Sequence, residues 1–285
     1  MGKLDKLQVL GSNLEQTILS LVKIPLFSRR PSPLPEQKGE NGDLVILANG
    51  PSLASTVELH RSFLEGKELM AVNLFVTSPL FNELQPSLYI IADPLFWIVD
   101  EKRDAVFGGL AEKTTWPLQL FVPARALSDP KWRPIVEKNS NITVRIYNTT
   151  PVEGFPPFER WAYRRGLGMP RPHNVLIPAI ATALRMHFKR IYLAGADHSW
   201  LPEITVTDDN EVLMHQKHFY DKGASKADTV KKENLDSAHL HTILYHMHVA
   251  FKAYFILRDY AEKLGKEVIN ITPGSFIDAF KREKP

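Results

Sequence analysis

The stretch Leu44-Val-Ile-Leu-Ala-Asn-Gly-Pro-Ser-Leu53 constrains the fold of this chain more than any other. Its apolar residues run without a break into a polar turn, which predicts a strand that is buried on both faces and ends just before a helix. Gly50 lets the backbone approach a ligand, Pro51 suits a first helical turn, and Ser52 can cap free amides. The chain is therefore expected to contain a buried strand-turn-helix unit.

A helix that starts after such a turn favours an anion, because its free amides and its dipole present positive charge. The turn matches neither the G-x-G-x-x-G pattern of dinucleotide-binding proteins nor the lysine motif of a P-loop. An ordinary strand-to-helix turn has the same composition. A nucleotide site at Asn49 and Gly50 therefore depends on what the rest of the chain contributes.

Apolar runs and helical patterns alternate along the chain from residue 43 onward. This alternation predicts an α/β fold with a Rossmann-like, mostly parallel sheet and helices on both faces. Strands are expected at residues 44–48, 69–75, 87–92, 118–123, 143–147, 190–195 and 267–272, and helices at residues 52–64, 174–187, 236–264 and 275–281.

Polar residues stand at the carboxyl ends of four of these strands, which is where ligands bind on parallel sheets. They are Asn49-Gly50, Asn73, Asp93-Pro94 and Gly195-Ala-Asp197-His198. Asn73 or Asp93 alone can also form an ordinary turn. Taken together, the four strand ends predict a ligand site along one edge of the sheet.

Residues 1–42 are expected to form an N-terminal amphipathic arm and a linker, and residues 43–285 one large domain. Helical spacing connects Leu4, Leu7, Leu10, Leu14, Ile18, Leu21 and Val22, and the segment 31–42 is polar and rich in proline. The arm packs on the domain or on a partner subunit, or lies on a membrane surface. We expect a homo-oligomer.

Two long stretches carry little periodicity. Residues 152–173 contain Arg160, Arg164, Arg165 and Arg171, which can pair with phosphate or carboxylate, although a solvated basic loop has the same composition. Residues 200–233, including Tyr220, are predicted to form a lid over a site. A β-hairpin insertion or a subunit contact would give the same pattern.

Composition excludes several functional classes. The chain has no cysteine, which excludes disulfides and thiolate sites and suits a cytoplasmic protein. A net charge of +3 does not suggest general nucleic-acid binding. The sequence has neither the pattern of a signal peptide nor a run of about 18 apolar residues, so we expect a cytoplasmic location, with peripheral contact at the inner membrane as the alternative.

Four histidines, His239, His241, His246 and His248, lie within ten residues of one predicted helix. They do not form H-E-x-x-H or another familiar metal spacing, so no metal is expected. Histidine exchanges a proton near neutral pH and therefore suits a general base. His248 flanks the apolar face of this helix, and a structural histidine is the alternative interpretation.

Short motifs occur in a consistent order between residues 43 and 280. Ala48-Asn-Gly-Pro-Ser-Leu53 is similar to Gly-Asn-Gly-Pro-Ser-Leu, and Asp93-Pro-Leu-Phe96 is similar to Asn-Pro-Ser-Leu-Phe. Val72-Asn73, Ile191-Tyr-Leu-Ala-Gly-Ala-Asp197 and Pro273-Gly-Ser-Phe276 have counterparts in the same order. The whole pattern resembles the bacterial CMP-sialic acid sialyltransferases of glycosyltransferase family 42.

This resemblance implies a GT-A-variant domain that needs no metal and transfers an acidic sugar from a CMP-sugar donor, with inversion, to a cell-surface glycan acceptor. Counting back from Pro273 without gaps places the catalytic base at His248, with His241 and His246 as alternatives. The expected contacts to substrate or nucleotide are Asn49, Gly50, Pro51, Ser52, Asn73, Asp93, Asn174, Gly195, Asp197, Arg171, Gly274 and Ser275.

The chain departs from the family at three places. Asn174-Val-Leu176 stands where the family has Thr-Ser-Gly, and the tyrosines that steady the leaving phosphate are replaced at best by His198 or Tyr220. Asp93 replaces an asparagine and would repel phosphate unless it is protonated or bound to a hydroxyl or metal.

An acidic residue at the third strand resembles the archaeal-type 6-hydroxymethylpterin diphosphokinases, which use ATP with Mg²⁺. Asp93 and Asp197 would then be candidate metal ligands. A non-catalytic nucleotide-sugar-binding protein is a further alternative.

Overall fold

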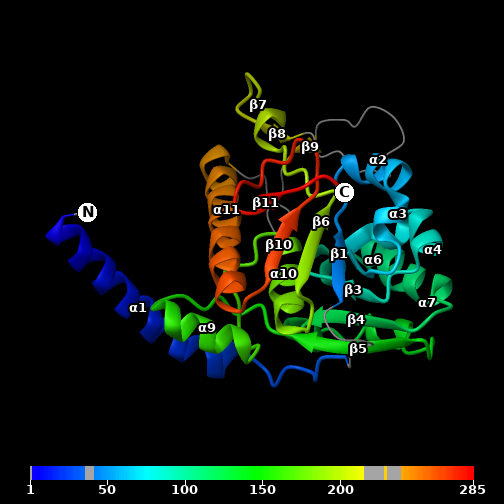
Figure 1. The fold of residues 1–285 in the computed structure, drawn as a ribbon, viewed down its shortest axis with the longest axis horizontal. Coiled ribbons are helices and arrows are strands. Elements are labelled where there is room, and N and C mark those ends of the chain that lie inside the picture. Colours follow the sequence, from blue (N-terminus) through cyan, green and yellow to red (C-terminus); the bar gives the residue numbers. More distant parts are fainter. Residues whose placement is uncertain (1, 36–41, 215–227, 230–238) are drawn as a thin grey trace.

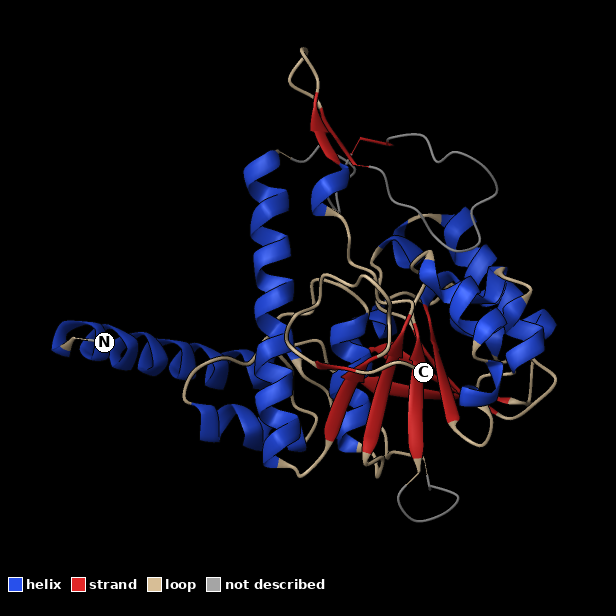
Figure 2. Cartoon of the chain, turned by 45° about the horizontal axis from the view of Figure 1, so that its top comes forward, coloured by secondary structure: helices blue, strands red, loops and turns tan. Residues whose placement is uncertain are grey.

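An eight-stranded sheet lies at the centre of the folded molecule (Figures 1 and 2). The computed structural model describes residues 2–35, 42–214, 228–229 and 239–285. Neighbouring strands of this sheet all run parallel, in the order β11-β10-β6-β1-β2-β3-β4-β5. The strands are β1 (Asp43–Leu47), β2 (Glu68–Val72), β3 (Leu88–Ile90), β4 (Leu118–Pro123), β5 (Ile142–Tyr147), β6 (Arg190–Ala194), β10 (Glu267–Asn270) and β11 (Lys281–Arg282).

Helices cover both faces of the sheet, which confirms the predicted α/β, Rossmann-like architecture. One face packs against α10 (Leu176–Arg185) and α11 (Leu240–Lys263). The other packs against a set of shorter helices, namely α2 (Ser52–Leu59), α3 (Arg61–Leu64), α4 (Leu80–Leu84), α5 (Leu95–Ile98), α6 (Asp100–Arg103), α7 (Gly109–Lys113) and α8 (Arg133–Val136), with the single-turn segments η1 (Asn73–Thr77), η2 (Asp104–Gly108) and η3 (Ala124–Ser128).

Strand β1 explains why the continuous apolar run predicted a parallel sheet. Leu44 and Ile46 point into the core beneath α10 and α11, whereas Val45 and Leu47 point into the core on the other face. All four side chains are completely buried. Burial of each contributes roughly 1.5–3 kcal/mol, so a polar residue at any of these positions would weaken one of the two cores.

The order of the strands reverses between β1 and β6. From β1 the chain continues to β2, β3, β4 and β5 on one side, whereas β6, β10 and β11 lie on the other. Leu47 is level with Ala71 of β2 and with Ala194 of β6, so the carboxyl ends of these three strands share one edge. Such a reversal is where open α/β sheets bind their ligands.

Several predicted boundaries are wrong in detail. The strand expected at residues 69–75 ends at Val72, because Asn73 has a left-handed backbone (φ 47°) and begins η1. The helix expected at residues 52–64 breaks at His60 into α2 and α3. The helices between β3 and β5 were not predicted. α5 and α8 have only four residues each, too few to show helical periodicity, whereas α6, η2 and α7 follow one another without a break from residue 100 to residue 113 and were missed.

The helix predicted at residues 275–281 is wrong. The chain there is irregular until β11, which pairs with β10. The buried Ser275 hydroxyl donates to the carbonyl of Ala196 (2.6 Å) and accepts from Asn270 Nδ2 (2.9 Å) and from the amide of Ile277 (3.2 Å). These side-chain bonds take the place of the helical hydrogen bonds, as serine side chains commonly do.

Helix α1 (Lys3–Phe27) projects from the body of the molecule (Figure 1). Its carboxyl-terminal half is held by residues 150–167, which include helix α9 (Pro156–Arg164). The hydroxyl of Ser20 donates to the carbonyl of Glu153 (2.8 Å), and the amide of Phe155 donates to Thr17 Oγ1 (3.0 Å). The segment 152–173, expected to be irregular, therefore contains a helix and anchors the arm.

A small antiparallel sheet follows β6, formed by β7 (Ile204–Val206), β8 (Val212–Met214) and β9 (Asp228–Thr229), after the short turn η4 (Leu201–Glu203). It lies above the carboxyl edge of the large sheet (Figure 1). The predicted lid at residues 200–233 is thus a β insertion in the part that the structure describes, and Tyr220 lies outside the described residues. Within the described ranges, no helix is both long and apolar enough to cross a membrane.

Candidate functional site

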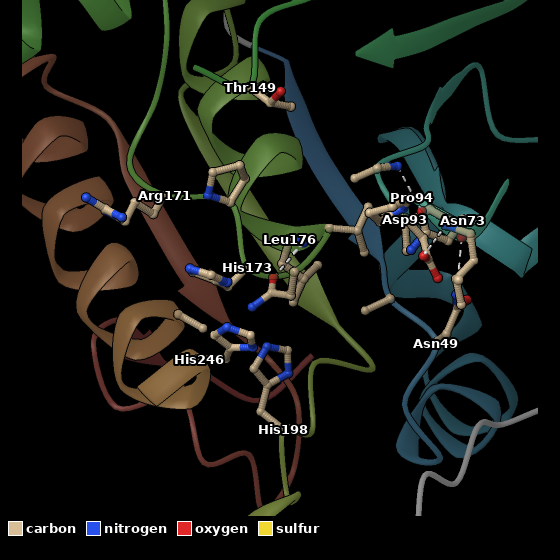
Figure 3. Close-up of a pocket in the computed structure, with 18 of the residues that line it drawn as sticks. Asn49, Asn73, Asp93, Pro94, Thr149, Arg171, His173, Leu176, His198 and His246 are labelled. Carbon is tan, nitrogen blue, oxygen red and sulfur yellow. Dashed lines mark hydrogen bonds between the residues drawn. The ribbon is translucent and has the colours of Figure 1, made fainter. Parts of the chain in front are cut away.

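A cavity of about 2030 Å³ opens at the carboxyl ends of the strands, where the strand order reverses. Asn49, Asn73 and Asp93 line one side of it, and His173, His198 and His246 line the other (Figure 3). The strand ends predicted to converge do converge. All four contribute residues to the wall of this cavity, which confirms that they share one edge of the sheet.

The turn after β1 leaves no space for a side chain at Gly50. Its amide donates to the carbonyl of Gly195 (2.9 Å), which joins the ends of β1 and β6. A Cβ atom at Gly50 would lie 1.9 Å from Asp197 Oδ2 and 2.5 Å from the Gly195 carbonyl oxygen. Glycine is therefore required here by close packing of two strand ends.

The start of α2 is already occupied by an acidic side chain. Asp197 accepts hydrogen bonds from the Ser52 amide (3.3 Å) and from the Ser52 hydroxyl (2.8 Å). Burial raises the pKa of the Asp197 carboxyl above its usual value, and the bonds from Ser52 partly counter this. The anion expected at this helix start is thus supplied by the protein itself, from a residue 145 positions away.

Asn49 and Asn73 are fixed by the backbone of the next strand along. Asn49 Nδ2 donates to the carbonyl of Val72 (3.2 Å), and Asn73 Oδ1 accepts from the amide of Ala92 (3.0 Å). Asn49 Oδ1 is buried and has no hydrogen-bond partner. An unpaired buried acceptor costs about 1–3 kcal/mol, which a donor reaching it from the cavity would recover.

Asp93 forms the turn that starts α5, because its Oδ1 accepts from the amide of Leu95 (2.9 Å). It stands after β3, whereas Asp197 stands after β6, and these strands are separated by β1 and β2. Three interstrand spacings place the two strand ends about 14 Å apart. The two carboxylates are therefore badly placed to bind the same Mg²⁺. Within the described residues, no group of three or more acidic, histidine or cysteine side chains could hold a metal.

A chain of hydrogen bonds fixes the ring of His198. The amide of Leu176 donates to Asn174 Oδ1 (2.9 Å), and the Tyr254 hydroxyl donates to the same oxygen (2.9 Å). Tyr254 has only one proton, so its 2.6 Å contact with His198 Nε2 requires Nε2 to be the donor. Nδ1 is then the proton acceptor of the neutral ring.

Burial lowers the pKa of His198 to about 3, so this histidine stays neutral in the folded protein. The unfolded chain, in contrast, takes up a proton below about pH 6.5. Native stability is therefore complete above that pH and decreases as the pH falls toward 3. From about pH 7 to about pH 5, this residue alone should lower the free energy of unfolding by about 2 kcal/mol.

Urea unfolding of wild-type protein and of the His198→Asn variant at both pH values would measure this effect. Asparagine does not titrate and tolerates the left-handed backbone of this position (φ 51°). The variant should lose about 2 kcal/mol less than the wild type on acidification. Equal losses in the two proteins would show that the ring titrates normally.

His173 and His246 form a stacked pair on the same side of the cavity, with ring centroids 4.7 Å apart and planes at 23°. Loss of surrounding water lowers the pKa of His173, and the charges of His246 and Arg171 lower it further. His173 therefore remains neutral to a lower pH than an isolated histidine does. A neutral imidazole beside a second one can accept a proton.

His248 is not brought to this cavity. Both His248 and His246, two residues earlier on α11, are exposed, but only His246 lines the wall. Two residues correspond to about 200° around a helix, so the two side chains point in nearly opposite directions. Among the four histidines of the cluster at residues 239–248, the structure favours His246 as the residue that can meet a ligand.

The predicted loop arginines also lie differently. Arg171 lines the cavity, but its Nη2 lies 2.7 Å from Glu153 Oε2 and its Nε contacts both oxygens of this carboxylate. This ion pair raises the pKa of Arg171. Arg160, Arg164 and Arg165 are not among the residues that line the cavity in the described chain.

Three cations that the sequence did not single out line the same cavity: Arg29, Lys102 and Arg125. None forms an ion pair among the described residues. Arg125 Nη2 donates to the carbonyl of Ala92 (2.9 Å), which places its charge next to Asp93. Arg125 and Thr149 follow β4 and β5, so the strand-end rule that found Asn73 could have found them too.

Other predicted contacts have structural roles. Asn174 accepts a hydrogen bond from the amide of Leu176 at the start of α10. Asn174, Pro51 and Gly195 all line the cavity. Ser275 is locked by the hydrogen bonds described above, and neither it nor Gly274 lines the cavity in the described chain. The cytidine contacts that the resemblance implied for these two residues are therefore not supported by their positions.

Comparisons with known proteins find only a distant structural similarity. No family model matches it, and no curated protein matches its sequence. Among solved structures, it is similar to the MAf glycosyltransferase from Magnetospirillum magneticum AMB-1, with 11% identity and a TM-score of 0.49, over 94% of this chain and 38% of that chain. The chain thus spans well under half the length of that protein, and the likeness is a distant one.

Proposed function

We propose that this chain is a glycosyltransferase that uses a nucleotide-activated sugar, with a CMP-linked acidic sugar as the donor and a cell-surface glycan as the acceptor. The observation that carries this proposal is the arrangement of the cavity at the strand reversal. Hydrogen-bonding amides and Arg125, which has no ion-pair partner in the described chain, line one side, and histidines line the other, where burial lowers the pKa of His173 and of His198. Such a cavity suits an anionic donor facing a proton acceptor.

The histidine side of the cavity would supply the general base. His246, supported by its stacked neighbour His173, would take the proton from the acceptor hydroxyl as the new bond to the sugar carbon forms. The bond from that carbon to the phosphate oxygen breaks in the same step, and its electron pair leaves with the nucleotide. Attack from the face opposite the leaving group inverts the configuration of the sugar carbon.

The cation side would hold the charge of the donor. Arg29, Lys102 and Arg125 have no ion-pair partners in the described chain, so they are free to meet phosphate or carboxylate oxygens. Arg171 is already paired with Glu153 and would have to break that pair first.

A thermal-shift screen with CMP, CDP, UDP, GDP and ATP, each with and without Mg²⁺, tests the proposal, since a ligand that binds the native state raises its melting temperature. CMP should give the largest shift, and EDTA should not remove it. Arg125→Ala should weaken CMP binding about tenfold, the effect of losing one charge-assisted hydrogen bond.

The matched control is Arg133→Ala. Arg133 is exposed and pairs with Glu137 outside the cavity, so this variant makes the same charge change and should bind CMP normally. A shift by ATP that requires Mg²⁺, with none by CMP, would instead favour the diphosphokinase-like alternative. CMP binding without turnover of any CMP sugar would favour a non-catalytic binding protein.

A further inference from the structure

Helix α1 exposes a broad apolar surface to solvent. Eleven of its large apolar side chains are exposed, and the fractions for Leu4, Leu7 and Leu14 are 70%, 64% and 54%. This is far more than single surface leucines require, and contiguous apolar surface on this scale marks an interaction site. The helix does not use this surface to pack on its own domain.

The exposed residues repeat every seven positions. Leu7, Leu14 and Leu21 form one row, and Leu4, Gly11 and Ile18 form the neighbouring row. We name these six residues the α1 seam. Apolar rows with this spacing are those through which two helices pair. Leu7, Leu14 and Leu21 supply a complete leucine row, and the other row has a gap at Gly11. The pattern thus fits another helix better than a flat surface.

The domain holds α1 by a different side. Ser20, which lies roughly 150° around the helix from the centre of the seam, is fully buried and bonded to the backbone of Glu153. The close approach at Gly154, where a Cβ would lie 2.1 Å from Thr17 Oγ1, also involves a residue outside the seam. Anchoring of the helix therefore leaves the whole seam free.

We propose that α1 pairs with α1 of a second copy of this chain through the seam. The seam with its flanking Leu10 and Val22 would bury roughly 700 Å² per copy and about 1,400 Å² per pair, above the ~1,000 Å² expected of a biological interface. The helix carries charges of both signs, Asp5 and Glu15 as well as Lys6 and Lys23. Helices that lie on membranes carry mostly Lys and Arg on their polar side, so a lipid surface fits less well.

The mass of the full chain in solution, measured by light scattering over a range of concentrations, tests this proposal. The wild type should have about twice the 32.4 kDa of one chain, and Leu7→Glu/Leu14→Glu should be monomeric. Val9→Glu/Ser12→Glu is the matched control, because both residues are exposed and lie outside the seam. It should remain dimeric.

Gly11 provides a test in the opposite direction. A Cβ there meets no atom within 4 Å, so Gly11→Leu fits the monomer and fills the gap in the seam. It should lower the dissociation constant roughly tenfold. A wild type that stays monomeric, or a double glutamate variant that stays dimeric, would overturn the proposal. So would a monomeric wild type that binds vesicles of phosphatidylcholine and phosphatidylglycerol through the seam residues.

Discussion

Replacing Gly50 with alanine should lower the free energy of unfolding by about 3 kcal/mol, at the upper end of the range for an overpacked site. The new methyl group would lie 1.9 Å from Asp197 Oδ2 and 2.5 Å from the Gly195 carbonyl oxygen. The second contact is with a backbone carbonyl that accepts from the Gly50 amide, so it cannot move without breaking the link between β1 and β6, and the Asp197 carboxylate can move only by giving up its hydrogen bonds with Ser52. Chemical denaturation would measure the loss, which corresponds to about 5 °C in melting temperature for a chain of 285 residues.

Gly108→Ala is the matched control, because a Cβ at Gly108 meets nothing within 4 Å and the residue lies within the helical segment η2. This variant should change stability by no more than about 1 kcal/mol, in the stabilising direction. If Gly50→Ala unfolds at the same denaturant concentration as the wild type, the two strand ends are not packed as described. Gly50→Ala should also lose the thermal shift with CMP, because the new methyl group would displace Asp197 and Asn49.

The second large effect is expected at His246. Its replacement by asparagine should lower the rate of sugar transfer by about 10²- to 10⁴-fold, the usual contribution of a general base. Asparagine keeps a polar side chain at the cavity wall but cannot take up a proton. The measurement is kcat with the CMP sugar that gives the fastest turnover, in protein shown to unfold like the wild type.

His248→Asn and His241→Asn are the controls, because both residues are exposed on the same helix and neither lines the cavity. They should transfer at the normal rate. If His248→Asn loses transfer and His246→Asn keeps it, the general base is His248, as the sialyltransferase resemblance implies.

The sequence was sufficient for seven of the eight strands of the large sheet and for the strand ends that line the cavity. Strands buried on both faces have continuous apolar runs, and β1 shows why, since its side chains fill two cores. The carboxyl ends of parallel strands must meet at one edge, so Asn49, Asn73 and Asp93 could be grouped without knowing the order of the strands. This rule follows from geometry and holds for any sequence with the same pattern.

The sequence was a poorer guide where the position of a side chain depends on the rotation of a helix or on a distant partner. A shift of two residues on α11 separates His246 from His248 by about 200°, which a gapless count along the chain cannot resolve. Arg171 was expected to contact substrate or nucleotide, and the sequence alone did not reveal Glu153, 18 positions away, as its ion-pair partner. Ser275 was assigned to a ligand, but it stabilises the irregular chain before β11.

The carboxylate of Asp197 already accepts the hydrogen bonds at the start of α2 that a bound phosphate would need. A phosphate that approached this helix would have to displace an anion that is already seated, so its binding would be an exchange and not a simple addition. Discrimination between a nucleoside and its phosphates would then pass to Arg29, Lys102 and Arg125. The ligand would lie with its charged end toward β4 and β5, and the turn at Gly50 would select for the shape of its uncharged part.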